Sequence, residues 1–178
     1  MPADAIREGL AYVSEDRKRY GLVLGMDITK NTTLIALNKV MKLKMINQAI
    51  EVKEAKEITS RMKLKAPNLD VEVGKLSGGN QQKVVLSKWL MNNPKILILD
   101  EPTRGIDVGA KYEIYKIMNE LVQQGVGIVL ISSELPEVLG MSDRIIVMSQ
   151  GRITGEFTRE EATQEKIMVC ATGGEKVV

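Results

Sequence analysis

Two adjacent carboxylates, Asp100 and Glu101, have the residue types and the placement that metal binding and acid–base chemistry require. They follow residues 96–99, a continuous apolar run typical of a strand buried on both faces of a parallel sheet. Parallel sheets bind ligands beyond the carboxyl ends of their strands. Asp100 is suited there to holding Mg²⁺, and Glu101 to polarising an attacking water as a general base. A lone Asp-Glu-Pro sequence is nevertheless more often a polar turn that simply ends a strand.

A second candidate segment lies at residues 76–83, which read Leu-Ser-Gly-Gly-Asn-Gln-Gln-Lys. Ser77 is a favoured helix N-cap, and the two glycines, Gly78 and Gly79, let a ligand approach the backbone closely. An apolar stripe follows, so a helix is expected to begin here. The free amides and the dipole of a helix N-terminus attract anions. By itself, this pattern is more typical of an ordinary serine-capped helix.

Taken together and in this order, the two segments resemble the ATPase domain of ABC transporters. Residues 76–83 resemble the signature motif, residues 96–101 the Walker B strand, and residues 104–107 the D-loop, while residues 131–134 lie where the switch loop is expected. Residues 103–111, Thr-Arg-Gly-Ile-Asp-Val-Gly-Ala-Lys, are especially similar to the second ATPase domain of monosaccharide importers. Those importers are of the ribose, xylose, arabinose and galactose type. The resemblance covers essentially the whole chain.

The resemblance implies that the ligands are ATP and Mg²⁺. It assigns the catalytic base to Glu101, a Mg²⁺ contact to Asp100 and the D-loop aspartate to Asp107. A nucleotide held mainly by a second ATPase domain would be contacted by the signature residues Ser77, Gly78, Gly79, Asn80 and Gln81.

Two positions depart from the family pattern. The run that begins Glu15-Asp16 resembles this subgroup's Q-loop, and the glutamine position is Glu15, or Ser14 if the alignment slips by one residue. A carboxylate at Glu15 would reach phosphates only through Mg²⁺. The switch histidine position is Ser133, which can donate a hydrogen bond but cannot carry a positive charge. A regulatory, weakly or non-hydrolytic nucleotide-binding role therefore stays open beside ATP hydrolysis.

No P-loop, Gly-x-x-x-x-Gly-Lys-Ser/Thr, occurs in the 178 residues. Gly74 and Gly79 have the glycine spacing, but Asn80-Gln81 follows where Lys-Ser/Thr is required. In the family the P-loop precedes the Q-loop, so we expect it upstream of Met1. The chain is then a fragment, and we expect it to be inactive alone.

An α/β layer fold must position these segments. Two further apolar runs, residues 128–131 and 145–148, predict strands, and we expect both in one sheet with residues 96–99. The strand at residues 128–131 is expected to run parallel to the strand at residues 96–99. Strand alternating with helix indicates right-handed crossovers. With the resemblance, this predicts a P-loop NTPase-like ABC ATPase fragment with a mainly parallel sheet and a helical subdomain. The connecting helix is expected to end before Gly125, and its apolar stripe comprises Ile114, Ile117, Met118, Leu121 and Val122.

The remaining elements follow from shorter patterns. We expect a helix remnant that ends at Gly9, a strand at residues 10–13, a hairpin that turns at Gln150-Gly151 into residues 152–157, and a last helix from near Thr163. The chain is thus divided into four parts: residues 1–24 with the Q-loop-like segment, residues 25–90 as the helical subdomain that ends in the signature helix, residues 91–158 as the α/β part with Walker B, D-loop and switch loop, and residues 159–178 as the C-terminal helix and tail.

Composition narrows the function classes. Apolar residues make up 44% of the chain and charged residues 27%, and the net charge of +2 offers no electrostatic case for nucleic acid. The sequence contains no histidine, which excludes a histidine base, and its single Cys170 indicates a reducing, cytosolic environment. No apolar run approaches the roughly 20 residues that span a bilayer, and the N-terminus does not resemble a signal peptide.

The resemblance also implies partners and a location. The partners are a second ABC ATPase domain, membrane permease subunits and, through the permease, a sugar-binding protein. The location is the cytoplasmic face of a bacterial cell membrane, peripherally bound. A DNA-repair or chromosome-structure ABC ATPase is disfavoured because neither a long coiled coil nor a zinc insertion is present. A nucleoside importer is a nearer relative, but that group often alters the Asp-Glu pair of Walker B.

Overall fold

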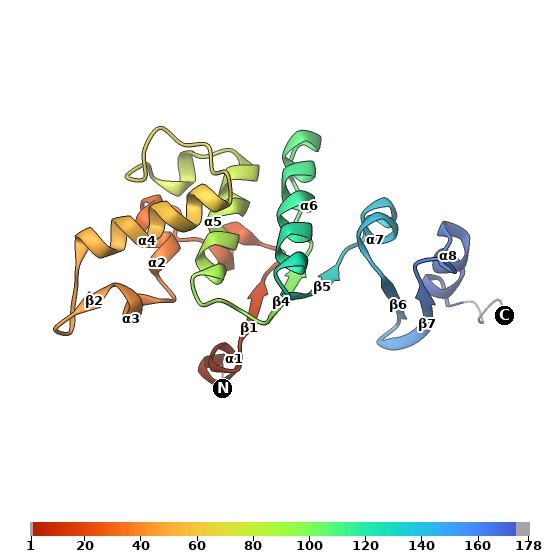
Figure 1. Ribbon diagram of the computed structural model, residues 1–178. Coiled ribbons are helices and arrows are strands. Elements are labelled where there is room, and N and C mark those ends of the chain that lie inside the picture. The colour runs from red at the N-terminus through yellow and green to blue at the C-terminus, as the bar shows by residue number, and fades with distance from the viewer. Residues whose placement is uncertain (1, 174–178) are drawn as a thin grey trace. The chain divides into compact units, whose positions relative to one another are not determined.

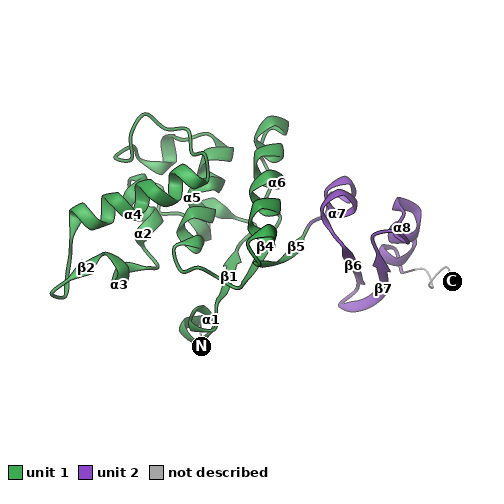
Figure 2. Cartoon of the chain, viewed as in Figure 1, with its two compact units in different colours: residues 1–131 green, residues 132–178 purple. Residues whose placement is uncertain are grey.

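The computed structural model describes residues 2–173, so the end of the predicted C-terminal tail lies outside the described residues. The chain forms two compact units, residues 1–131 and residues 132–178, as coloured in Figure 2. The boundary between them falls directly after the strand at residues 127–131. The finer division at residues 24, 90 and 158 follows the motifs and stays a prediction.

A three-stranded parallel sheet forms the centre of the first unit (Figure 1). Its strands are β1 (Leu10–Val13), β4 (Ile96–Asp100) and β5 (Gly127–Ile131), in the order β1-β4-β5. Leu97 pairs with Ala11 on one side and with Ile128 on the other. The predicted strand at residues 10–13 and the predicted parallel pairing of residues 96–99 with 128–131 are both confirmed.

The sheet is buried on one face rather than on both, so that part of the prediction is wrong. Leu97 and Leu99 are fully buried, whereas Ile96 is 40% exposed and Val129 is 50% exposed. The apolar run encodes a strand, but a run without alternation does not reveal how much of each face other elements cover. The side chains on the exposed face include Tyr12, at 46%.

The third predicted strand belongs to a different sheet, which corrects the expectation of one sheet. Strand β6 (Arg144–Ser149) pairs antiparallel with β7 (Arg152–Thr158), and these two strands form their own sheet. The reason lies in the burial of the apolar run. Ile145 and Val147 are buried while Met148 is 62% exposed, the alternation of a one-sided hairpin strand. The predicted turn at residues 150–151 is confirmed.

Residues 25–90 are mainly helical, as expected. They contain α2 (Ile28–Thr33), α3 (Leu37–Val40), α4 (Gln48–Arg61) and α5 (Gly78–Leu90), of which α2, α4 and α5 pack on one another (Figure 1). A small hairpin of β2 (Met41–Lys42) and β3 (Met45–Ile46), which the sequence reading did not predict, interrupts the helices.

Short helical pieces flank these elements. Helix α1 (Pro2–Arg7) precedes β1, where the sequence predicts a helix remnant. The charged run after β1 forms a π-helical turn (Arg17–Gly21), and Asp16 caps it by accepting the backbone N–H groups of Lys18 and Arg19. A 3-10 turn (Val73–Lys75) precedes α5.

Helix α6 (Val108–Gln123) connects β4 and β5 in the predicted position. Its buried residues are Ile114, Ile117, Met118 and Leu121. Val122, which was expected in the same stripe, is 50% exposed. Gly125 has a φ of +88° one residue beyond the C-cap, the left-handed conformation in which glycine ends a helix without strain.

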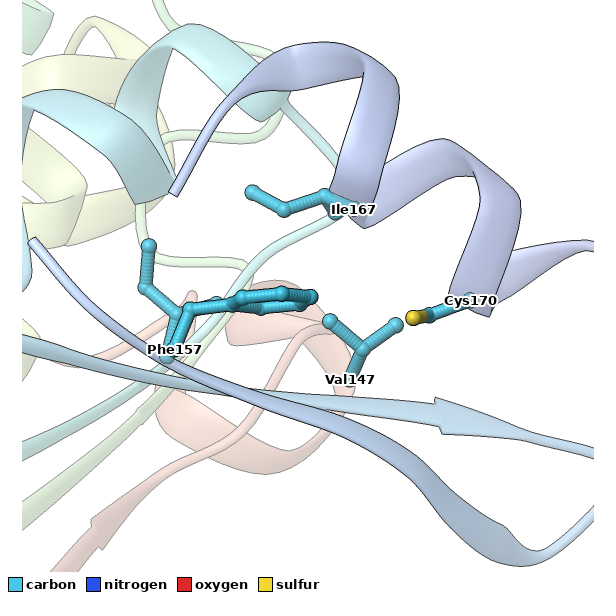
Figure 3. Packing of buried hydrophobic residues seen from close by; sticks show 5 residues of the cluster. Val147, Phe157, Ile167 and Cys170 are labelled. Carbon is cyan, nitrogen blue, oxygen red and sulfur yellow. The ribbon is translucent and has the colours of Figure 1, made fainter. Parts of the chain in front are cut away.

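The second unit consists of α7 (Leu135–Met141), the β6–β7 hairpin and α8 (Gln164–Ala171). Thr163 caps α8 at the predicted start. Val147 and Phe157 of the hairpin face Ile167 and Cys170 of α8, and these side chains belong to the hydrophobic core of the second unit (Figure 3). Across the described residues, the structure contains no helix long and apolar enough to cross a membrane.

Candidate nucleotide site

The carboxylate pair lies at the carboxyl end of the central strand, as the sequence predicts. Asp100 is the last residue of β4 and is half-buried. The hydroxyl of Tyr12, on the neighbouring strand β1, donates a hydrogen bond of 2.8 Å to Oδ2 of Asp100. This hydrogen bond to a carboxylate raises the pKa of Tyr12. Tyr12 therefore orients the Asp100 carboxylate, a role that the sequence reading missed because it depends on the pairing of β1 with β4.

Glu101 turns the chain sharply away from the sheet. Its φ is +45°, in the left-handed region that residues other than glycine rarely adopt. The Glu101 N–H donates to the carbonyl of Ile131 at 2.9 Å, and the Glu101 carbonyl accepts the N–H of Arg104 at 3.1 Å. Such strained backbone concentrates at functional sites, where the surrounding contacts hold it in place. The two neighbouring carboxylates thus differ in backbone conformation: Asp100 is still part of strand β4, whereas Glu101 is in the left-handed region.

The signature-like turn begins α5 as predicted. Ser77 caps the helix, and its Oγ accepts the Asn80 N–H at 3.4 Å and the Asn80 side-chain amide at 3.0 Å. Gln81 is only 4% exposed, and its side-chain amide donates to the Val73 carbonyl at 3.2 Å. This inward placement ties α5 to the turn before it and does not favour a nucleotide contact by the Gln81 side chain.

The two glycines of this turn are closely packed by residues distant in the sequence. A Cβ on Gly78 would lie 2.8 Å from a guanidinium nitrogen of Arg17 and 3.0 Å from the Gly105 carbonyl oxygen. A Cβ on Gly79 would lie only 2.5 Å from the Cβ of Ala110. A methyl group on Gly79 would require the α5–α6 contact to shift, whereas one on Gly78 would displace the Arg17 guanidinium and press on the Gly105 carbonyl, so the absence of a side chain allows the close packing at both positions.

The close approach of Gly79 to Ala110 brings the N-termini of two helices together. Asp107 caps α6 by accepting the Ala110 N–H at 2.9 Å, as Ser77 caps α5. Helix N-termini carry partial positive charge, and a pair of them favours an anion more than either does alone. The D-loop-like segment therefore lies against the signature-like turn.

Arg17 fastens this arrangement and was not among the predicted site residues. Its Nη1 donates to the Arg104 carbonyl at 2.7 Å and its Nη2 to the Gly105 carbonyl at 3.3 Å. Burial lowers the pKa of Arg17, although nearby Asp16 opposes that shift. In the sequence Arg17 is one of several consecutive charges, and no local signal separates it from its solvated neighbours.

Glu15 forms an ion pair with Arg104, and the same region encloses a depression of about 360 Å³ that Arg17 and Lys18 help to line. The Glu15 side chain is 46% exposed and that of Arg104 is 66% exposed. The carboxylate that was predicted to contact Mg²⁺ therefore has a cationic partner from the D-loop-like segment.

Ser133, the predicted switch position, lies in the second unit just before α7. The adjacent Glu134 N–H donates to Oγ of Ser132 at 3.0 Å, which shapes the start of that helix.

Oxygen ligands suited to Mg²⁺ are present at the end of β4. Asp100 and Glu101 supply carboxylates, and within residues 2–173 no cluster of three or more acidic, histidine or cysteine side chains could hold a metal ion. Mg²⁺ commonly uses one or two carboxylates and completes its shell with waters and substrate phosphates. The two carboxylates therefore fit Mg²⁺ that arrives with a nucleotide.

Comparison with known sequences identifies relatives. A family model described as ABC transporter matches residues 2–104. The chain is 79% identical over 173 residues to a xylose import ATP-binding protein of Geobacillus kaustophilus, covering 97% of the chain and 34% of that protein. It is 60% identical to an L-arabinose transport ATP-binding protein of Geobacillus stearothermophilus, covering 94% of the chain and 33% of the relative. The chain thus spans about a third of the length of the curated relatives it matches.

Solved structures with the same fold are ATP-binding cassettes. The cassette MJ1267 of an ABC transporter matches with a TM-score of 0.75 at 25% identity, over 97% of this chain and 68% of that one. A component of an ABC transporter complex from Clostridium perfringens matches with a TM-score of 0.73 at 27% identity, over 92% of this chain and 62% of that one. The predicted P-loop NTPase-like α/β fold is confirmed.

Proposed function

Because the chain belongs to the ABC transporter family, we propose that it is part of the ATP-hydrolysing subunit of an importer for a monosaccharide. The sugar class follows from the relatives, which are named for import of xylose, arabinose and ribose. The observation that supports the catalytic part of the proposal is the arrangement of the two carboxylates at the end of β4. There Asp100 is oriented by Tyr12, and Glu101 follows on a left-handed turn.

Within this function the site residues serve two nucleotides. Asp100 and Glu101 act on the nucleotide of their own domain, with Asp100 toward Mg²⁺ and Glu101 as the general base. When bound, Mg²⁺ neutralises charge that develops on the phosphates. Ser77, Gly78, Gly79 and Asn80 face the nucleotide of a second ATPase domain. The contact of their turn with residues 105–110 supports this grouping because it joins the signature-like and D-loop-like segments.

The partners proposed on this basis are a second ABC ATPase domain, permease subunits in the membrane and a sugar-binding protein that acts through the permease. Conversion of ATP-driven closure into movement of the permease requires the chain to lie at the cytoplasmic face of the membrane, held there by those subunits.

The test is Glu101→Gln in the assembled importer. Loss of a general base slows hydrolysis by about 10²–10⁴-fold, while ATP binding stays nearly unchanged because the replacement is isosteric. Glu120→Gln is the matched control, since Glu120 lies on the exposed side of α6 and pairs with Lys63 at the surface. An unchanged rate in Glu101→Gln would contradict the assignment of the base at an active site.

A regulatory, weakly hydrolytic half-site is the second candidate function, and Ser133 favours it because a hydroxyl cannot carry the charge of a switch histidine. Ser133→His distinguishes the two. At a silent site the added imidazole restores hydrolysis that depends on Glu101, whereas at an active site it changes the rate little. ATP turnover of Ser133→His with and without Glu101→Gln therefore decides between them.

The 178-residue chain alone is proposed to neither bind MgATP tightly nor hydrolyse it. Its sequence contains no P-loop, the segment whose amides and lysine cradle the β- and γ-phosphates. One helix N-terminus is worth about 0.3–1 kcal/mol toward an anion at an exposed site. Micromolar binding requires about 8 kcal/mol. Calorimetric titration with MgATP is the measurement, and micromolar affinity would contradict the assignment of the phosphate-binding segment.

A further inference from the structure

Arg17 lies where three segments that are far apart in the sequence meet. Its guanidinium donates to two consecutive carbonyls, those of Arg104 and Gly105, at 2.7 and 3.3 Å. The same guanidinium occupies the space beside Gly78, where a Cβ would approach Nη2 to 2.8 Å. One side chain therefore contacts both the D-loop-like segment and the signature-like turn.

The chemistry of arginine suits this position. Its planar group presents several N–H donors in a rigid fork, so it can hold two neighbouring carbonyl oxygens at once. A lysine carries the same charge but lacks that fork. Because a peptide unit is planar and trans, holding the carbonyls of Arg104 and Gly105 toward Arg17 turns the N–H groups of the next residues away from it. Arg17 thereby sets the direction of backbone donors in the D-loop-like segment.

Other contacts also join these segments, and two of them can be compared with the Arg17 hydrogen bonds by their geometry. The Glu15–Arg104 ion pair is largely exposed, and such pairs contribute little in water. The packing of Gly79 on Ala110 brings the helix ends together without orienting the carbonyls of residues 104 and 105. Among these contacts, the Arg17 hydrogen bonds are the ones that determine how the loop presents its backbone.

We propose that Arg17 is a positioning residue that holds residues 104–107 against the signature-like turn, so that both present their backbone to the nucleotide as one preorganised surface. The proposal rests on the proposed function for the identity of the ligand. Its structural part, the mechanical joining of two segments by Arg17, is independent of any nucleotide.

Hydrogen exchange on the 178-residue chain tests the structural part. Four hydrogen-bonded amides report on the two segments: Asn80, Gln81, Arg104 and Ala110. In Arg17→Ala, exchange is expected to rise about tenfold or more at these amides, while the β4 amides exchange as before. Lys18→Ala is the matched control, because Lys18 is an exposed cation in the same turn. Arg17→Lys is expected to raise exchange at the same four amides, since it keeps the charge and loses the fork.

The outcomes separate cleanly. Unchanged exchange at the four amides in Arg17→Ala, or an equal rise in β4, would show that Arg17 supports the fold generally and would overturn the proposal. If Arg17→Ala does not fold, Arg17→Lys decides by the same comparison. Neither result depends on whether Glu101 is a base, so failure here is distinguishable from failure of the proposed function.

The assembled importer tests the functional part. Misplaced groups lower kcat, and a shift of about 1 Å can cost as much as 10²-fold. Arg17→Lys is therefore expected to lower kcat about tenfold or more and leave KM for ATP within about twofold, because ATP is first held by the P-loop of the other domain. A titration of bound ATP corrects kcat for the active fraction. A raised KM with unchanged kcat would mean that Arg17 binds the nucleotide itself, which would overturn its positioning role.

Discussion

A buried lysine joins the two helices whose N-termini form the candidate site, and removal of its partner carboxylate is expected to weaken the first unit. Lys83 on α5 is 1% exposed, and its Nζ donates to Oε2 of Glu113 on α6 at 2.6 Å and to the Lys63 carbonyl at 2.8 Å. Lys65 donates to Oε1 of Glu113 at 2.8 Å. In Glu113→Gln the buried ammonium keeps hydrogen-bond acceptors but loses its counter-charge.

The magnitude follows from the pKa of Glu113. The hydrogen bonds from Lys65 and Lys83 lower that pKa from 4.5 to about 2. A change of about 2.5 pH units corresponds to about 3.4 kcal/mol. The Glu113 side chain is 35% exposed, so solvent screening reduces this figure, and we expect a loss of about 2 kcal/mol. For a chain of this size the melting temperature then falls by about 4–8 °C.

Urea denaturation at neutral pH is the assay, with Glu120→Gln as the matched control. Glu120 on α6 pairs with Lys63, in the turn that follows α4, but their side chains are 46% and 62% exposed, so that pair is worth about 0.2–1 kcal/mol. If Glu113→Gln loses no more stability than Glu120→Gln, the buried pair does not stabilise the helix contact and the reasoning is wrong.

The pH dependence gives an independent check on the same pair. A carboxylate with a lowered folded-state pKa stabilises the fold above its unfolded pKa, and that contribution is lost as pH falls through the folded pKa. The stability difference between the natural chain and Glu113→Gln is therefore full above pH 4.5 and shrinks between pH 4.5 and about 2. A difference that stays constant through this window would refute the assigned cause.

Two further predictions concern the candidate site. In the assembled importer, Glu15→Arg and Arg104→Glu are each expected to lower ATP turnover modestly, because each reversal places two like charges side by side, an effect beyond loss of the weak exposed pair. The charge-swapped double variant is expected to recover part of that loss, and no recovery would indicate that Glu15 acts directly on Mg²⁺. Gly79→Ala is expected to cost about 1–3 kcal/mol in urea denaturation, because the new Cβ would meet Ala110 at 2.5 Å. Gly140→Ala, with open space around it, is the control and is expected to be neutral or slightly stabilising.

Much of the fold could be predicted because it is written in local patterns. Apolar runs identified the strands at residues 96–99 and 128–131, and helical spacing identified α6. N-cap residues identified the starts of α5 and α8, where Ser77 and Thr163 accept backbone N–H groups. The β2–β3 hairpin was not predicted, because Leu43 and Lys44 adopt positive φ where a hairpin signal would have shown asparagine or glycine.

The carboxylates and the signature-like turn could also be located in advance, since motif order places them at a strand end and a helix start. Their roles in hydrolysis stay predictions. The contacts of Tyr12 and Arg17 could not be predicted, because each side chain bonds to a segment more than 80 residues away in the chain. Tyr12 and Asp100, for example, are 88 residues apart. Hydrophobic periodicity carries no information about such polar contacts.

By itself, the sequence determined the identity of the elements, the order of the motifs and the family to which the chain belongs. These properties depend on neighbouring residues, whose spacing decides helix, strand and cap. Only the tertiary structure decided that β6 pairs with β7, that one face of the central sheet is exposed, and that Arg17 joins residues 104–105 to Gly78. These properties depend on tertiary contacts. The free energy of such contacts comes from packing and hydrogen bonds between segments that are distant in the sequence.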